Sequence, residues 1–193
     1  MRFELVLAGV GGQGVLSMAA IFTEAARREG LYVKQAEVHG MAQRGGSVQA
    51  TVRVSSDQIA SELVSHGTVD VILGLEPVEA LRYVDYLSSA GGLITATDPV
   101  ENISDYPPLE AVHEQVRLLR GDLVEASRLA REAGSPRSSN VVMVGAASMR
   151  VPLPTETLEA CIREGFAVKG DRVAEANIRA FRLGRESLAP AQG

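Results

Sequence analysis

The sequence predicts one α/β domain, Rossmann-like, with a parallel or mixed sheet covered by helices on both faces. Two observations lead to this fold class: strand-like and helix-like runs alternate along the chain, and a glycine-rich turn follows the first strand-like run. The chain has 193 residues, of which 46% are hydrophobic, so one core can bury roughly 70% of its unfolded surface. Because no linker-like stretch interrupts the chain, we expect a single domain over residues 1–193.

The first strand is expected at residues 3–8, and the segment Gly-Val-Gly-Gly-Gln-Gly follows it directly at residues 9–14. A helix should begin near Gly14, because apolar residues then recur at helical spacing and Gly30 marks the stop. In this order the turn can direct free amides and the positive end of the helix dipole at a phosphate or another anion. The alternative is a tight turn that packs against a neighbouring subunit. The side-chain amide of Gln13 adds a polar group that such a turn does not need. The candidate binding residues are Gly9, Gly11, Gly12, Gln13 and Gly14.

Residues 37–47 gather an acid, an imidazole, an amide, a guanidinium and three glycines between two strand-like runs. Packing does not require that mixture, and loops of such composition commonly carry function. Arg44 is the main candidate, because a planar guanidinium suits phosphate or carboxylate. His39 is a candidate for a place beside a reaction centre or, equally, a structural partner of Glu37. The candidate binding residues of this segment are Glu37, Gln43, Arg44, Gly45 and Gly46.

The next strand is expected at residues 47–54, which alternate strictly between apolar and polar side chains. Two strands joined by a glycine-rich polar loop, without a crossover helix, do not form the repeating unit of a dinucleotide-binding domain. This weighs against a second interpretation, in which Glu37 would hold the ribose hydroxyl of a dinucleotide.

The rest of the chain continues the alternation of strands and helices. Further strands are expected at residues 69–73 and 92–97, and Pro77 is well placed as the first residue of a helix that reaches Val84. Residues 98–108 carry prolines and form a surface loop. A short strand is expected at residues 116–119, and helices at residues 109–115, 123–133, 140–149, 155–164 and 171–188.

Several other polar residues have simple structural interpretations. Glu76, directly before Pro77, is expected to cap the following helix. Cys161 lies beside apolar residues in a helical run, so we expect a buried thiol. His66 and His113 have no companions at metal-ligand spacing and are treated as ordinary polar positions, so no metal site is expected.

Composition excludes several classes of protein. A single cysteine supplies neither a disulfide within the chain nor the four thiolates of an iron–sulfur cluster. The net charge of −5 argues against general nucleic-acid binding. Neither a signal peptide nor an apolar run of the ~20 residues that a membrane span needs is present in the sequence. We therefore expect a cytoplasmic protein that contacts neither nucleic acid nor membrane.

Five segments, spread in order over nearly the whole chain, carry a resemblance to a known family. They resemble the γ-type domain of the thiamine diphosphate-dependent 2-oxoacid:ferredoxin oxidoreductases, and most closely the indolepyruvate-specific members. The Gln-Arg-Gly-Gly sequence at residues 43–46 is the most specific part of the match. The segments are residues 9–14, 37–47, 74–80, 140–145 and 177–181.

The resemblance implies a subunit of a hetero-oligomer whose large partner holds thiamine diphosphate, Mg²⁺ and [4Fe–4S] clusters and passes electrons to ferredoxin. The chain has neither the Gly-Asp-Gly start of a thiamine diphosphate motif nor a Cys-x-x-Cys pair, so we expect it to bind no cofactor and to be inactive alone. The implied reaction is oxidative decarboxylation of an arylpyruvate such as indolepyruvate, with coenzyme A as co-substrate. The glycine turn and residues 37–46 would then form one lip of the active site.

Three alternatives remain at this stage. The complex could act on another 2-oxoacid, such as 2-oxoglutarate, a branched-chain 2-oxoacid or pyruvate. The chain could be a free-standing nucleotide-binding protein. It could also be a purely structural subunit whose loops only form an interface.

Overall fold

A six-stranded mixed sheet forms the centre of the molecule, with the strand order β2-β3-β1-β4-β5-β6. The computed structural model describes residues 1–39, 45–101 and 103–189. The β1–β4, β4–β5 and β5–β6 pairs are parallel. β3 is antiparallel to both of its neighbours, β1 and β2. The mixed sheet and the direct β2–β3 pairing confirm the expected fold class. The strands are β1 (Arg2–Val10), β2 (Tyr32–His39), β3 (Ser47–Ser55), β4 (Val69–Gly74), β5 (Leu87–Ala96) and β6 (Asp122–Val124).

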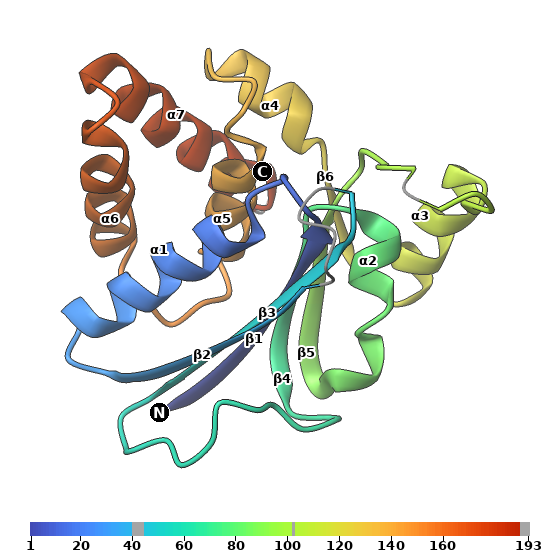
Figure 1. Ribbon diagram of the computed structural model, residues 1–193, viewed down its shortest axis with the longest axis horizontal. Coiled ribbons are helices and arrows are strands. Elements are labelled where there is room, and N and C mark those ends of the chain that lie inside the picture. The colour runs from blue at the N-terminus through green and yellow to red at the C-terminus, as the bar shows by residue number, and fades with distance from the viewer. Residues whose placement is uncertain (40–44, 102, 190–193) are drawn as a thin grey trace.

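Helices cover both faces of this sheet, as expected (Figure 1). One face is covered by a large helical layer of α1 (Val15–Arg28), α4 (Ala126–Glu132), α5 (Ser139–Ala147), α6 (Thr155–Ala167) and α7 (Asp171–Ser187). The other face carries α2 (Pro77–Leu81), a 3₁₀ turn at Val84–Tyr86 and α3 (Leu109–Leu118). Among the helices that the structure describes, none is both long and apolar enough to cross a membrane.

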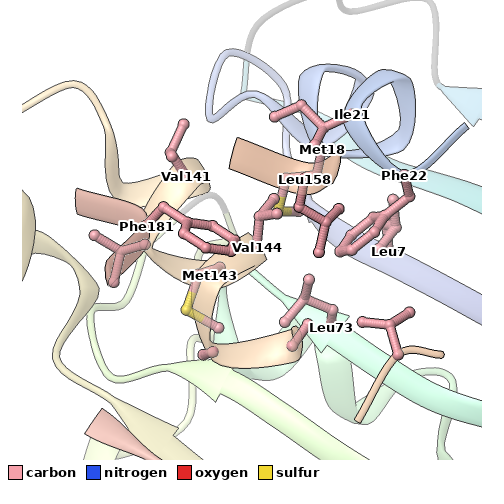
Figure 2. Packing of buried hydrophobic residues seen from close by; sticks show 14 of the residues in the cluster. Leu7, Met18, Ile21, Phe22, Leu73, Val141, Met143, Val144, Leu158 and Phe181 are labelled. Carbon is pink, nitrogen blue, oxygen red and sulfur yellow. The ribbon is translucent and has the colours of Figure 1, made fainter. Parts of the chain in front are cut away.

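The core consists of two apolar layers because the central strands are buried on both faces. On the larger side, Leu7 of β1 and Leu73 of β4 form one cluster with Phe22 of α1, Met143 of α5 and Phe181 of α7 (Figure 2). On the smaller side, a second cluster forms beneath α2 and α3. Successive strand side chains point to opposite faces, so continuous apolar runs in β1 and β4 serve both layers.

The region after α3 corrects two sequence-based expectations. Residues 116–119 do not form a strand: α3 continues to Leu118, because Val116 lies one helical turn after Val112 and both are buried. Arg120 then adopts φ 55° and ends the helix. The strand is β6, and α4 begins at Ala126 rather than at residue 123. A three-residue strand is too short to show a periodicity, and its pairing with β5 is a long-range contact.

A buried carboxylate lies near the start of the central strand β1, at the end of the sheet opposite the glycine turn. The side chain of Glu4 is 1% exposed and accepts hydrogen bonds from Arg53 Nε at 3.0 Å, Arg2 Nε at 2.9 Å and Thr68 Oγ1 at 2.6 Å. Burial alone would raise the pKa of Glu4, but the Thr68 and Arg2 hydrogen bonds, together with the charges of Arg53 and Arg2, outweigh it. They hold this pKa below its ordinary value.

Glu4 should therefore make the fold sensitive to acid. With the pKa lower in the folded than in the unfolded chain, the unfolded chain binds more protons between the two pKa values, so stability falls as the pH drops. The contribution is complete above about pH 4.5, the ordinary carboxyl range, and is lost as the pH falls through the folded pKa. Urea denaturation between about pH 3 and 7 would measure this. Glu4→Gln should be less stable at neutral pH and should show a shallower acid dependence; an unchanged pH slope would contradict the assignment.

Candidate functional site

The glycine turn lies where β1 ends and α1 begins. Gly14, the residue before the first turn of α1, adopts φ 98° and ψ 28° in the left-handed region. A Cβ on Gly14 would lie 2.7 Å from Asn140 Nδ2, and one on Gly9 would lie 2.8 Å from Gln13 Oε1. Gly12 also has a positive φ of 101°, with open space beside it. Glycine is therefore required at Gly9 by crowding, at Gly12 by backbone conformation, and at Gly14 by both.

The side chain of Gln13 closes this turn from within. Its Oε1 accepts a hydrogen bond from the Val10 amide at 2.7 Å, and its Nε2 donates to the Leu75 carbonyl oxygen at 3.0 Å. Gln13 thereby connects the end of β1 to the residue that follows β4. Both ends of the side-chain amide that looked available for a ligand are therefore engaged by backbone groups of the chain.

The turn is also joined to the second glycine-rich segment, as the sequence suggested. The Gly11 amide donates to the Gly46 carbonyl oxygen at 2.8 Å, and the Gly45 amide donates to the Gly11 carbonyl oxygen at 3.3 Å. Two regions more than thirty residues apart therefore lie side by side. Gln43 and Arg44 lie outside the described residues, as does the side chain of His39.

Glu37 is not brought to the glycine turn. It lies on β2, opposite Ala50 of β3, and β3 separates it from β1. Its carboxylate is exposed and accepts a hydrogen bond from Gln35 Nε2 at 2.6 Å. A dinucleotide-binding unit would need the acidic residue on a strand next to the glycine turn, so this topology argues against the ribose-binding interpretation.

A cleft beside the N-terminus of α1 is the main concave site at the turn. We call it the α1 cleft and define it by Gly12, Gly14, Ser17, Arg137, Asn140 and Lys169; its volume is about 580 Å³. The amides of Gly12 and Gly14 donate to none of the described residues, and α1 has no side-chain cap. Two residues with unpaired amides therefore line this space, which lies at the positive end of a 14-residue helix.

The charge of the α1 cleft is uniformly positive. Arg137 and Lys169 are exposed, and none of the described residues that line the cleft is acidic. Lys169 Nζ lies 5.3 Å from the centre of the Phe166 ring, and Arg137 forms no ion pair with the described part of the chain. Asn140 is 7% exposed, and its side-chain amide makes no hydrogen bond with any described residue. The cleft therefore suits an anion.

Sequence reasoning did not identify Arg137, Lys169 or Asn140 as parts of one site. The available signal was the Ser-Pro-Arg-Ser-Ser-Asn run at residues 135–140, a turn-rich segment with an unpaired cation directly before a helix. This run is attached to α7, because Ser138 Oγ donates a hydrogen bond to Asn177 Oδ1 at 2.8 Å. Two segments of the family resemblance, which begin at Asn140 and Asn177, therefore meet at the cleft.

A second cleft of about 480 Å³ adjoins the first and lies at the carboxyl ends of β4 and β5. We call it the proline-loop cleft and define it by Gly12, Gln13, Leu75, Asp98, Pro99 and Arg137. Gly12, Gln13 and Arg137 line both clefts. Because ligands in open α/β sheets bind at the carboxyl ends of the strands, the position agrees with the general rule.

Glu76 connects Tyr106, which lies between β5 and α3, to the start of α2. This carboxylate is fully buried; its Oε2 accepts a hydrogen bond from the Glu79 amide at 2.7 Å, which confirms the predicted helix cap. Its Oε1 accepts a hydrogen bond from the Tyr106 hydroxyl. Burial of the phenol raises the pKa of Tyr106, and the neighbouring Glu76 carboxylate raises this pKa further.

The remaining candidates lie apart from the clefts. Cys161 is 6% exposed, as expected, and burial raises the pKa of its thiol. His66 stacks on Tyr86 with ring centres 4.1 Å apart, and His113 Nε2 lies 3.0 Å from the Thr97 carbonyl oxygen. Within residues 1–39, 45–101 and 103–189, no three His, Cys, Asp or Glu side chains come together to hold a metal ion.

Comparison with known proteins agrees with this geometry. The family model described as pyruvate ferredoxin/flavodoxin oxidoreductase matches residues 4–187. Indolepyruvate oxidoreductase subunit IorB of Thermococcus kodakarensis is 39% identical over 197 aligned residues, which cover 95% of this chain and 94% of that protein.

Solved structures show the same fold. Pyruvate oxidoreductase subunit PORC of Thermotoga maritima matches with a TM-score of 0.69 at 26% identity, over 96% of both chains. The 2-oxoglutarate:ferredoxin oxidoreductase of Magnetococcus marinus, solved with 2-oxoglutarate, coenzyme A and succinyl-CoA bound, matches with a TM-score of 0.74 at 24% identity. That match covers 96% of this chain but 31% of the longer chain.

These comparisons confirm the resemblance that the five sequence segments carry. The family model covers nearly the whole chain, and a relative at 39% identity has almost the same length. The chain therefore belongs to the pyruvate ferredoxin/flavodoxin oxidoreductase family, in which it is similar to the IorB subunits of indolepyruvate oxidoreductases.

Proposed function

We propose that this chain is the γ-type subunit of a thiamine diphosphate-dependent indolepyruvate:ferredoxin oxidoreductase and that its glycine turn helps to bind coenzyme A. The γ-type domain covers residues 1–193, and the complex works in the cytoplasm. A larger partner subunit carries thiamine diphosphate, Mg²⁺ and the [4Fe–4S] clusters and delivers electrons to ferredoxin. The chain is inactive alone, because the chemistry of decarboxylation and electron transfer belongs to cofactors on the partner.

The single observation that carries the coenzyme A part of the proposal is the composition of the α1 cleft. Coenzyme A presents phosphate groups, and the cleft combines unpaired glycine amides, a helix N-terminus and two cations with no acidic residue among its described lining. Backbone amides at a helix start bind phosphate oxygens, and an arginine adds a charge-assisted hydrogen bond. The chain's own residues thus bind and orient the nucleotide end of the co-substrate.

The two glycine-rich segments provide the second part of the proposal. Gly45 and Gly46 lie against Gly11 of the glycine turn. We propose that Arg44 contacts a phosphate of coenzyme A or the carboxylate of the 2-oxoacid, with Gln43 beside it, and that His39 lies near the reaction centre. Glu37 has no ligand in this proposal, because β3 separates it from the turn.

The test uses the assembled enzyme. The chain is co-expressed with the large subunit, and turnover is followed by viologen reduction with indolepyruvate and coenzyme A. Arg137→Ala should raise the KM for coenzyme A about tenfold, the loss expected for one charge-assisted hydrogen bond, and should leave assembly intact. Arg131→Ala, an exposed arginine on α4 that lines neither cleft, is the matched control. An unchanged KM for coenzyme A in Arg137→Ala would exclude the cleft as its site.

Arg44→Ala in the same complex identifies the partner of that guanidinium. We expect a loss of about 1.5–3 kcal/mol, or roughly 10- to 150-fold in the affected step. A raised KM for coenzyme A indicates phosphate contact, whereas a raised KM for the 2-oxoacid indicates its carboxylate. If the KM values for both substrates stay within twofold of wild type, Arg44 is a surface cation without a ligand. Parallel assays with 2-oxoglutarate, a branched-chain 2-oxoacid and pyruvate decide the substrate.

A further inference from the structure

Two fully buried carboxylates, Glu76 and Glu79, lie three residues apart at the start of α2, and the proposed function uses neither. Their exposed fractions are 0% and 1%. Charged side chains are almost never this buried unless they are paired, so each should have a defined structural task. The structural task of Glu76 is already evident. One of its carboxylate oxygens caps α2, and the other accepts a hydrogen bond from the Tyr106 hydroxyl.

Glu79 extends from α2 to another element, the first residue of β3. Its Oε2 accepts a hydrogen bond from the Ser47 hydroxyl at 2.6 Å and lies 3.3 Å from Arg82 Nε. Ser47 is opposite Val10 in the last residue pair of the β1–β3 ladder, at the edge where β1 gives way to the glycine turn. The contact therefore attaches the start of β3 to α2.

A short series of hydrogen bonds continues from this contact to the turn. Gly46, directly before Ser47, accepts the Gly11 amide at 2.8 Å, and Gly45 donates to the Gly11 carbonyl oxygen at 3.3 Å. Gly11 in turn precedes Gly12, which lines the α1 cleft. The position of the cleft amides is thus linked through backbone hydrogen bonds to Ser47, and through Ser47 to the buried carboxylate.

We propose that Glu79 is a positioning residue: through the Ser47 hydroxyl it holds residues 45–47 against the glycine turn and so keeps the amides of the α1 cleft in place. The consequence for ligand binding rests on the proposed function. The positioning itself does not, because the hydrogen bond between the Gly11 amide and the Gly46 carbonyl oxygen can be followed without any ligand.

The direct test is hydrogen exchange of the Gly11 amide in the full chain, resolved by nuclear magnetic resonance. Ser47→Ala removes the donor to Glu79 and should speed exchange at Gly11 about five- to tenfold through local opening, with no comparable change in the core strands. Ser47→Thr keeps a hydroxyl and suits a strand, so it should restore exchange to within twofold of wild type. Ser56→Ala removes a serine hydroxyl that bonds the Met1 amino group at the other end of β3, and should leave Gly11 unchanged.

Glu79→Gln tests whether Glu79 acts through its hydrogen bond with Ser47 or through its negative charge. A glutamine oxygen can still accept the Ser47 hydroxyl, so this variant should protect Gly11 better than Glu79→Ala. In the assembled enzyme, Ser47→Ala should raise the KM for coenzyme A more than it lowers kcat, because it displaces a binding element rather than a reacting group.

Two results would overturn the positioning role: Gly11 exchange within twofold of wild type in Ser47→Ala, or failure of Ser47→Thr to restore slow exchange in a folded chain. The proposed function is judged separately by Arg137→Ala. If that variant leaves the KM for coenzyme A unchanged while Ser47→Ala still loosens Gly11, the ligand assignment fails and the positioning role stands.

Discussion

Gly184→Ala is expected to lower the free energy of unfolding by about 3 kcal/mol or more, because α5 and α7 cross through two opposed glycines. A Cβ on Gly184 would lie 1.9 Å from the Val142 carbonyl oxygen, and one on Gly145 would lie 1.9 Å from the Phe181 carbonyl oxygen. Both obstacles are backbone atoms, so no side chain can rotate away to relieve the overlap. The two helices would have to separate, which would open the core around Phe181.

Urea denaturation of the full chain measures this effect, with Gly145→Ala expected to behave alike. Gly165→Ala is the matched control, since Gly165 lies on the exposed side of α6 with nothing within 4 Å of an added Cβ. It should be neutral or stabilising by about 0.5–1 kcal/mol, because alanine favours a helix over glycine. If Gly184→Ala is no less stable than Gly165→Ala, the close crossing of α5 and α7 is wrong.

Gly14→Ala is expected to damage both stability and ligand binding. A left-handed alanine costs about 1–2 kcal/mol, and the new Cβ would lie 2.7 Å from Asn140 Nδ2, the end of a side chain that must move aside at a smaller further cost. The total should be about 2 kcal/mol. On the proposed function, displacement of Asn140 and of the first α1 amides should also raise the KM for coenzyme A at least about tenfold in the assembled enzyme.

Gly12→Ala distinguishes the cost of the left-handed backbone conformation from the cost of the steric contact with Asn140. Gly12 has nearly the same φ, 101° against 98°, but no atom lies within 4 Å of its added Cβ, so only the conformational cost applies. Asn140→Ala in the Gly14→Ala background should recover part of the lost stability, because it removes the atoms that crowd the new Cβ. Equal destabilisation by Gly12→Ala and Gly14→Ala, with no recovery in the double variant, would contradict the contact with Asn140.

Local sequence signals predicted the parts of the fold whose causes are local. The glycine turn, the start of α1 after Gly14 and the stop at Gly30 follow from backbone conformations that glycine permits. Pro77 opens α2, and Glu76 caps it, because both effects act within one helical turn. Alternation in β3 correctly placed Val48, Ala50, Val52 and Val54 on the core side, since strand side chains change face at every residue.

Sequence reasoning failed where a contact between distant segments decides the outcome. β6 forms only because β5 offers it a parallel edge, and its three residues carry no pattern of their own. Gln13 looked like a free amide in the sequence, yet the nearby Leu75 carbonyl oxygen, 62 residues away, engages it. Arg137 and Lys169 are ordinary surface cations until α5 and α7 bring both to the N-terminus of α1.

The sequence by itself determined the α/β class, the glycine turn, the β2–β3 pair and the family, because glycine positions, helix caps and side-chain periodicity are properties of neighbouring residues. Only the tertiary structure decided which groups share the α1 cleft, that β3 separates Glu37 from it, and that Glu79 reaches Ser47. The physical reason is distance along the chain. Each of these relations joins segments that the sheet order and the helical layer bring together, and no short-range pattern encodes the register between them.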